Sequence, residues 1–273
     1  MFNCAISLAG DCADFAAARR LAALADIIVA ADGGADLLLK AEIAPDWVIG
    51  DNDSAQMSLP AETKRILFPQ DKNYTDGELA ISLALYLADS ANDSNKNKSL
   101  SRYISNFSPD KNSSFAASES LANSLIDNFR QAENLSSYSF LVLFPFGQRV
   151  DHTWTNVLLA ASLARLGALV YLSDGLTMVR VVAGKLQLQP VFEPEVLECS
   201  AITSLNDVAF SAIPLDDNVE GFSLKGLKWE LDQTRLAYNM TTAVSNRSLA
   251  GEKLAPTLTL EAGTVMLVLT PAN

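Results

Sequence analysis

The chain has 273 residues, 49% of them hydrophobic and 19% charged, which is typical of a soluble globular protein with one large or two smaller domains. Its formal net charge of −12 argues against a general affinity for DNA or RNA, because contacts to phosphates need clustered Lys and Arg. No apolar run approaches the roughly 18 residues of a membrane-spanning helix, so we expect no membrane association.

The N-terminal part of the chain alternates apolar runs with helical patterns. In chain order we expect a strand over 4–8, a helix over 13–25, a strand over 27–31, a short helix to about 41, strands over 47–49 and 66–68, a helix over 75–87, a strand over 140–144, a helix over 153–166 and a strand over 169–172. The helix after Thr75 has the clearest start, because Thr75 and Glu78 fit a capping box. This alternation predicts a mainly parallel sheet flanked by helices on both faces.

From about residue 178 the pattern changes to short β-type segments separated by turn residues. The segments are MVRVVAGKLQLQ, VLECSAITSL, VAFSAI, FSLKG and TLTLEAGTVMLVL. Their alternating polarity, with glycines between them, predicts an antiparallel β-sandwich or barrel. We therefore expect an α/β domain over 1–177 and a C-terminal antiparallel β-sandwich domain over 178–273.

The segment 90–124 fits neither pattern, because 17 of its 35 residues are Ser or Asn. So polar a stretch cannot offset its ordering entropy by burial, and we interpret it as a flexible insertion. It is either a dispensable surface loop or a segment with a regulatory or partner-binding role.

The cysteines and the N-terminus indicate where the protein resides. Cys4, Cys12 and Cys199 form no CxxC pair, and the opening MFNCAISLAGDCADF lacks the basic region of a signal peptide. We therefore expect a reduced, cytoplasmic setting. In that setting the N-x-S triplets of 90–124 are chance matches rather than glycosylation sites.

Acidic loops follow the predicted strands, whereas neither GxxxxGK[ST] nor GxGxxG occurs. The loops contain Asp32 with Gly33 and Gly34, Asp51 with Asp53, Lys72 with Thr75 and Asp76, and Arg149 with Asp151 and His152. The carboxyl ends of parallel strands meet at one crevice, so we expect these loops to converge. At Gly33, free backbone N–H groups at a helix start suit a phosphate.

Each acidic residue also has a purely structural explanation. Asp32, Asp51 and Asp53 can stabilise turns, and Asp76 and Asp151 can complement helix N-termini. Taken together, however, so many carboxylates at equivalent positions would repel one another without a cation among them. The whole pattern therefore favours a metal site.

In six ordered blocks the chain resembles the thiamine pyrophosphokinase family. ADGGA, PDWVIGDNDS, DKNYTDGELAI and GQRVDHTWTN are similar to its signature blocks, and GLKWEL and VSNRS to its closing motifs. The resemblance covers most of the chain apart from 90–124. Three positions depart from the family pattern, namely Asn52, Asn73 and Gln148, and none of them removes a residue with a proposed charged role.

The resemblance implies a homodimer in which an α/β domain binds ATP with Mg²⁺ and the partner's sandwich completes a thiamine site. By position, Asp51, Asp53 and Asp76 would hold Mg²⁺. The other implied residues are Asp32, Gly33, Gly34, Lys72, Thr75 and His152 around ATP, Arg149 and Asp151 at the phosphates and the reacting hydroxyl, and Trp229, Ser245 and Asn246 at thiamine. An indole face such as that of Trp229 suits the cationic thiazolium.

The implied reaction transfers a pyrophosphoryl group from ATP to the hydroxyl of thiamine, giving thiamine diphosphate and AMP. Such a step needs charge neutralisation and alignment more than covalent participation. Either Asp76 or Asp151 can assist deprotonation of the hydroxyl. The alternatives are a pyrophosphokinase of the same fold that acts on another heterocyclic alcohol such as a hydroxymethylpterin, a non-catalytic nucleotide- or thiamine-binding protein, and a metal-dependent phosphohydrolase.

Overall fold

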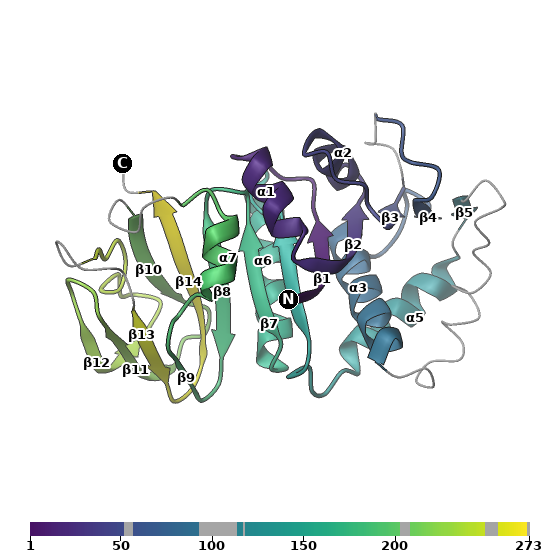
Figure 1. Ribbon diagram of the computed structural model, residues 1–273. Coiled ribbons are helices and arrows are strands. Elements are labelled where there is room, and N and C mark those ends of the chain that lie inside the picture. Colours follow the sequence, from purple (N-terminus) through teal and green to yellow (C-terminus); the bar gives the residue numbers. More distant parts are fainter. Residues whose placement is uncertain (52–56, 93–113, 117, 203–207, 249–255, 272–273) are drawn as a thin grey trace.

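The computed structural model describes residues 1–51, 57–92, 114–116, 118–202, 208–248 and 256–271 (Figure 1). Its helices are α1 (Phe15–Ala22), α2 (Gly34–Lys40), α3 (Asp76–Asn92), α5 (Glu119–Arg130), α6 (Val150–Arg165) and α7 (Pro194–Cys199). Its strands are β1 (Phe2–Ser7), β2 (Ala25–Ala31), β3 (Trp47–Gly50), β4 (Lys64–Leu67), β5 (Ser114–Ala116), β6 (Ser139–Leu143), β7 (Leu169–Ser173), β8 (Met178–Ala183), β9 (Leu186–Leu188), β10 (Val208–Pro214), β11 (Val219–Lys225), β12 (Leu231–Leu236), β13 (Thr257–Leu260) and β14 (Thr264–Pro271). Within these ranges no helix is both long and apolar enough to cross a membrane.

Ten strands form one long sheet in the order β10-β14-β8-β7-β6-β1-β2-β3-β4-β5. The strands from β7 to β5 in this order are mutually parallel, and Ile6 of β1, for example, pairs with Val29 of β2 and Val142 of β6. The chain moves outward from β1 in one direction and later, from β6, in the other. Ligands of open parallel sheets bind beside such a reversal, at the carboxyl ends of the strands.

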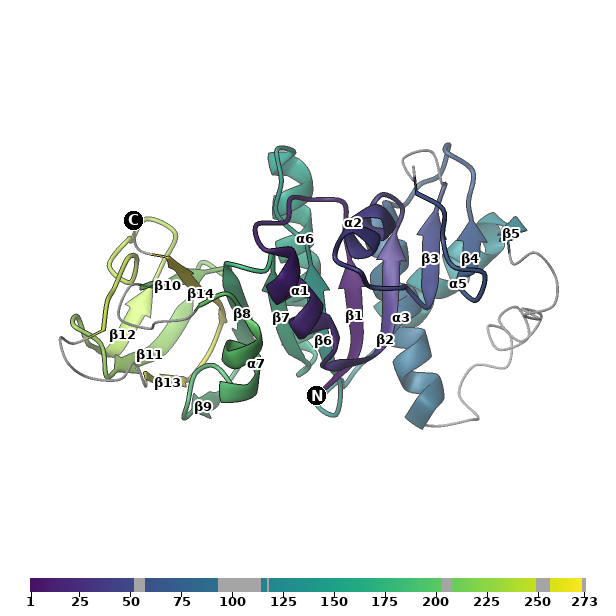
Figure 2. The same ribbon diagram turned by 45° about the horizontal axis from the view of Figure 1, so that its top comes forward.

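Helices cover both faces of the parallel part of the sheet (Figures 1 and 2). Side chains alternate along each strand, so Ile6 packs with α3, α5 and α6 in one core, whereas its neighbour Ala5 packs with α1, α2 and α7 in the other. Both of these side chains are fully buried. The predicted mainly parallel α/β sheet with helices on both faces is confirmed, with most element ends shifted by one to three residues.

A second sheet, in the order β12-β11-β13-β9, faces the antiparallel end of the long sheet (Figure 1). Phe210 and Leu267 of the long sheet share one core with Phe222 and Leu258 of the short sheet. The expected antiparallel sandwich is therefore confirmed. Strands β8, β14 and β10 form one layer of the sandwich and also continue the long sheet of the α/β part. The domain division at 177/178 therefore stays a prediction.

One expectation for the C-terminal part was wrong, and one strand was not predicted. Residues 196–202, the described part of VLECSAITSL, contain the end of helix α7 rather than a strand, because Pro194 supplies the backbone angle that suits a first helical turn. Only Val196 of this helix is buried, so its apolar residues are too few to show a helical period. Strand β12 was missed because LDQTRL is largely polar, as suits an exposed edge strand.

The predicted flexible insertion over 90–124 includes residues that belong to helices and a strand. Helix α3 continues to Asn92, β5 adds an edge strand over Ser114–Ala116, and α5 begins at Glu119. Ser118 caps α5 by accepting a hydrogen bond from the backbone N–H of Leu121, and Leu121 and Ala122 are buried. Ser118, Ser120, Asn123 and Ser124 cap this helix or lie on its outer face, while its apolar face packs on α3. Residues 93–113 and 117 lie outside the described residues.

Candidate functional site

Three carboxylates meet at the carboxyl ends of neighbouring parallel strands. Asp32 directly follows β2, Asp51 follows β3, and Asp76 opens α3, which comes after β4. One carboxylate oxygen from each residue lies within 4.8 Å of the other two. We refer to Asp32, Asp51 and Asp76 as the acidic cluster. Asp53, which was expected here as well, lies outside the described residues.

Backbone geometry brings these side chains together. Asp32 has a φ of 42°, in the left-handed region, and its N–H donates to the carbonyl of Ile49. Gly50 has a φ of 154°, and a Cβ there would lie 2.9 Å from Cβ of Asp32 and 3.2 Å from Oδ1 of Asp76. Only glycine therefore lets β3 pass so close to both carboxylates. Sequence reasoning gave Gly50 no role, although its place directly before Asp51 was a usable signal.

Lys72 supplies a positive charge to the acidic cluster. Its ammonium nitrogen lies 3.1 Å from Oδ1 of Asp76 and 3.3 Å from Oδ2 of Asp51. Burial alone would lower the pKa of Lys72, but the two carboxylates outweigh it and hold the pKa above its ordinary value. Lys72 is therefore a charged ammonium group in a half-enclosed position.

The charges of the cluster also affect Asp76. Burial raises the pKa of its carboxyl, the hydrogen bond and charge of Lys72 oppose that shift, and the charges of Asp51 and Asp32 add to it. The net result is a pKa above the ordinary value of an aspartate. Removing a carboxylate from water and placing it beside two others both disfavour the ionised form.

The donor set fits a divalent cation. Asp32 is 8% exposed, and its Oδ1 has no hydrogen-bond partner among the described residues. A buried carboxylate oxygen without a partner is costly unless a cation or another donor satisfies it. Carboxylate oxygens are also the ligands that Mg²⁺ prefers. Asp32, Asp51 and Asp76 are therefore suited to hold such an ion.

The start of α3 lies against the loops that flank the reversal at β1 and β6. Thr75 and Glu78 form the expected capping box, with Glu78 N–H donating to Thr75 Oγ1 at 3.1 Å and Thr75 N–H donating to Glu78 Oε2 at 3.1 Å. A Cβ on Gly77 would lie 3.5 Å from Oδ1 of Asn156 in α6. The amide of Asn156 in turn donates to the carbonyl of Pro145, in the loop after β6. Asn156 thus holds this loop to α6 and lies beside the start of α3, a role that sequence reasoning missed.

Arg149 and Asp151 form a two-pronged ion pair at the N-terminus of α6. Nε of Arg149 lies 3.0 Å from Oδ1 of Asp151, and a second guanidinium nitrogen lies 2.5 Å from Oδ2. The guanidinium holds the pKa of Asp151 below its usual range. Both residues are exposed, as is His152, so the structure presents them to solvent rather than within the acidic cluster.

Trp229 is half exposed on the loop between β11 and β12. Its backbone is held by Asn246, whose Oδ1 accepts from the Trp229 N–H at 3.1 Å and whose Nδ2 donates to the Trp229 carbonyl at 2.6 Å. Asn246 itself is buried, whereas Ser245 is exposed and has a φ of 59°. The ammonium group of Lys228 lies 4.5 Å from the centre of the indole ring, so this face already attracts a cation.

Comparison of the chain with models of known protein families identifies its family. Residues 18–172, more than half of the chain, match the family described as "Thiamin pyrophosphokinase, catalytic domain", and residues 203–263 match "Thiamin pyrophosphokinase, vitamin B1 binding domain". The chain belongs to the thiamine pyrophosphokinase family. No curated protein sequence matches the chain.

Solved structures of thiamine pyrophosphokinases share its fold. The chain is similar to a family member from Enterococcus faecalis (18% identity, TM-score 0.60), with 99% of this chain and 100% of that chain covered. It is also similar to thiamin pyrophosphokinase from Candida albicans (16% identity, TM-score 0.68, 98% and 89% covered). The yeast enzyme gives 16% identity and a TM-score of 0.64, with 98% and 86% covered. At these identities the likeness concerns the fold.

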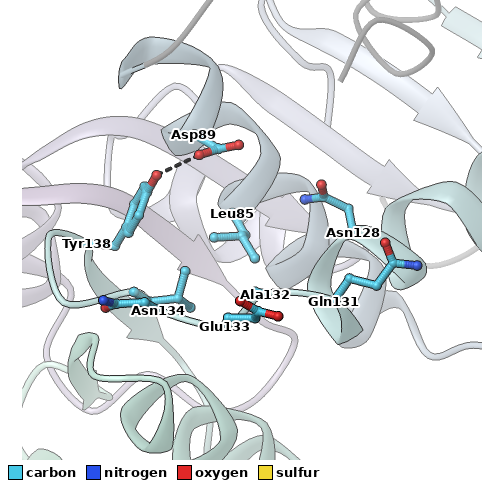
Figure 3. Close-up of a pocket in the computed structure, with 9 residues that line it drawn as sticks. Leu85, Asp89, Asn128, Gln131, Ala132, Glu133, Asn134 and Tyr138 are labelled. Carbon is cyan, nitrogen blue, oxygen red and sulfur yellow. Dashed lines mark hydrogen bonds between the residues drawn. The ribbon is translucent and has the colours of Figure 1, made fainter. Parts of the chain in front are cut away.

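A polar hollow of about 460 Å³ lies away from the acidic cluster of this thiamine pyrophosphokinase family member (Figure 3). It opens between the last turn of α3 and the end of α5, where the Tyr138 hydroxyl donates to Oδ1 of Asp89 at 2.6 Å. Asp89 lies 13 residues beyond Asp76 along α3, which is about 20 Å at the helical rise. The hollow is therefore not part of the candidate site.

Proposed function

We propose that the protein transfers a pyrophosphoryl group from ATP to the hydroxyl of thiamine, producing thiamine diphosphate and AMP. The observation that carries this proposal is the meeting of Asp32, Asp51 and Asp76 at the carboxyl end of the parallel sheet, in a chain of this family. We further propose a reduced, cytoplasmic setting, which suits three free cysteines.

In the proposed reaction the thiamine hydroxyl oxygen bonds to the β-phosphorus while the bond from the β-phosphorus to the oxygen of AMP breaks. The acidic cluster, together with Asp53, would hold Mg²⁺, which supplies charge neutralisation at the phosphates when bound. Gly33 and Gly34, which follow Asp32 at the start of α2, would offer backbone N–H groups to a phosphate. The chain's own residues thus bind and orient the polyphosphate.

Arg149 and Asp151, at the start of α6, would contribute at the phosphates and the reacting hydroxyl. The guanidinium is exposed and can exchange its bond to Asp151 for phosphate oxygens, because exposed ion pairs are weak. The low pKa of Asp151 keeps this carboxylate ionised, so it can accept a hydrogen bond from the thiamine hydroxyl. Asp76, whose pKa is raised, is the better acceptor for a proton but is held by Lys72.

Trp229 suits the cationic thiazolium ring. Its exposed indole already faces the ammonium group of Lys228, and a flat cation in the same place would stack on more of the ring. Asn246 would act through the Trp229 backbone, which it holds by two hydrogen bonds, and Ser245 stands exposed beside it.

Exposed apolar side chains support a homodimer with shared sites. Val150, Trp154 and Leu158 recur every four residues along one exposed face of α6. Val244 is likewise exposed, two residues before the Asn246 that holds Trp229, and Tyr238 is exposed in the loop after β12. Large exposed apolar side chains that gather in this way mark interaction surfaces, and a second copy that laid its sandwich loops on α6 would bury both sets.

The activity is tested by identifying products. The protein is incubated with ATP, Mg²⁺ and, separately, thiamine, a hydroxymethylpterin or no acceptor. We expect AMP and thiamine diphosphate with thiamine alone. Transfer to the pterin would reassign the substrate, ADP or free phosphate would contradict pyrophosphoryl transfer, and absence of any product would favour a binding protein.

A further inference from the structure

The acidic cluster already contains an internal cation. Lys72 precedes α3 by four residues, its side chain is 10% exposed, and its ammonium nitrogen lies 3.1 Å from Asp76 and 3.3 Å from Asp51. That charge offsets the repulsion among three carboxylates whose oxygens lie within 4.8 Å of one another. Lys72 therefore stabilises the acidic cluster in the metal-free protein.

A divalent cation on the same oxygens would conflict with Lys72 in this position. Mg²⁺ lies about 2.1 Å from its oxygen ligands. A cation bonded to Oδ1 of Asp76 would therefore lie at most about 5 Å from the ammonium nitrogen, and like charges that close repel strongly where water is partly excluded. The long, flexible stem of lysine allows the ammonium group to move away.

We propose that Lys72 is a displaceable counterion: it holds the acidic cluster together in the metal-free protein and leaves when Mg²⁺ enters. This inference rests on the proposed function, because that function assigns Mg²⁺ to the cluster. The displaced ammonium group stays beside the cluster, where it meets the phosphates of a nucleoside triphosphate. Mg²⁺ alone then binds weakly, because it competes with Lys72, and binds more tightly with the nucleotide, which gives the lysine a new partner.

The test uses calorimetry to measure the affinity of the nucleotide-free protein for Mg²⁺ added alone. We expect Lys72→Met to bind Mg²⁺ at least about tenfold more tightly than the unaltered protein, because the competing charge is gone. Lys72→Arg keeps the charge and should leave the affinity nearly unchanged. The matched control is Lys185→Met, which removes an exposed, ion-paired lysine from the sandwich and should also have no effect.

Equal or weaker Mg²⁺ binding by Lys72→Met, or no Mg²⁺ binding by any of the proteins, would overturn the inference. If Lys72→Met does not fold without metal, Lys72→Gln, which keeps hydrogen-bonding capacity but no charge, takes its place with the same expected result. The factor by which ATP tightens Mg²⁺ binding should also be smaller in the uncharged variant. Formation of thiamine diphosphate by the unaltered protein is measured separately. If the unaltered protein forms this product but Lys72→Met binds Mg²⁺ with unchanged affinity, the counterion role is overturned and the proposed function is not.

Discussion

Gly50 and Asp32 approach so closely that a Cβ atom on Gly50 would lie 2.9 Å from Cβ of Asp32. The contact joins the end of β3 to the residue that follows β2, and Oδ1 of Asp76 lies on the same side of Gly50 at 3.2 Å from that Cβ position. The spacing of the acidic cluster therefore depends on the absence of a side chain at residue 50.

Gly50→Ala should displace the carboxylates and lower both Mg²⁺ affinity and turnover by at least about tenfold, since roughly 1 Å of misplacement is enough for such losses. It should also lower the free energy of unfolding by about 1–3 kcal/mol, because alanine rarely adopts this φ. Gly184→Ala is the matched control, since Gly184 has a φ of 71° but no neighbouring atom within 4 Å. It should lose stability and keep turnover. Equal activity in both variants would show that Gly50 has no part in the site.

Asp51→Asn and Asp76→Asn should each cut turnover at least about 100-fold while leaving the fold intact, because each removes a charge from the proposed metal site. The same result is expected for Asp53→Asn. Asp127→Asn, an exposed position in α5, is the control and should behave like the unaltered protein. Near-normal turnover in the first three variants would leave these residues as turn and helix-start residues.

The raised pKa of Asp76 gives a pH dependence with a definite sign. A carboxyl whose pKa is higher in the folded than in the unfolded state contributes stability that is complete below the unfolded value, about 3.9, and is lost as pH rises through the folded value. The stability of the metal-free protein relative to Asp76→Asn should therefore increase as pH falls from neutral, through the folded pKa of Asp76, towards the unfolded value. The rise in melting temperature caused by Mg²⁺ should shrink over the same range, because protons compete for Asp76. A Mg²⁺ effect that is constant between pH 7 and about pH 4 would contradict this.

Trp229→Ala should raise the KM for thiamine several-fold or more and leave that for ATP nearly unchanged, because a ring cation on an indole is worth roughly 0.5–2 kcal/mol. If sites are shared, mixing Trp229→Ala chains with Asp51→Asn chains should produce heterodimers with one intact site and partial recovery of activity. Subunit exchange without recovery would place each site within one chain. An unchanged KM for thiamine would leave Trp229 as a packing residue.

Trp154→Glu should shift the protein towards monomers in sedimentation experiments and reduce turnover, because it places a charge in the exposed apolar face of α6. Thr155→Glu introduces the same charge on an adjacent exposed position and is expected to keep the oligomeric state. A monomeric unaltered protein with full activity would refute the shared-site arrangement.

Leu125→Ala should lower the free energy of unfolding by about 2–5 kcal/mol in urea denaturation, because Leu125 is fully buried between α5 and α3. Gln131→Ala, at the exposed end of α5, should change it little. A small loss at Leu125 would return this helix to the dispensable insertion that the sequence suggested.

The parts of the fold that follow from local pattern could be predicted. Asp32, Asp51 and Asp76 each come after a predicted parallel strand, and the structure brings their carboxylates together for that reason. What escaped prediction depends on contacts between distant segments. Lys72 pairs with Asp51 across 21 positions of sequence, and Asn246 holds the Trp229 backbone across 17. Helix α5 was missed for a different reason: Leu121, Leu125 and Phe129 recur every four residues, but the surrounding Ser and Asn were interpreted as a flexible insertion.

Phosphorus NMR of the protein with ATP, Mg²⁺ and thiamine follows the transfer of an intact pyrophosphoryl group to thiamine directly. We expect one AMP for each thiamine diphosphate formed, no ADP or free phosphate, and loss of both products in Asp51→Asn. Accumulation of ADP or free phosphate, or ATP that stays intact with thiamine present, would contradict pyrophosphoryl transfer to thiamine.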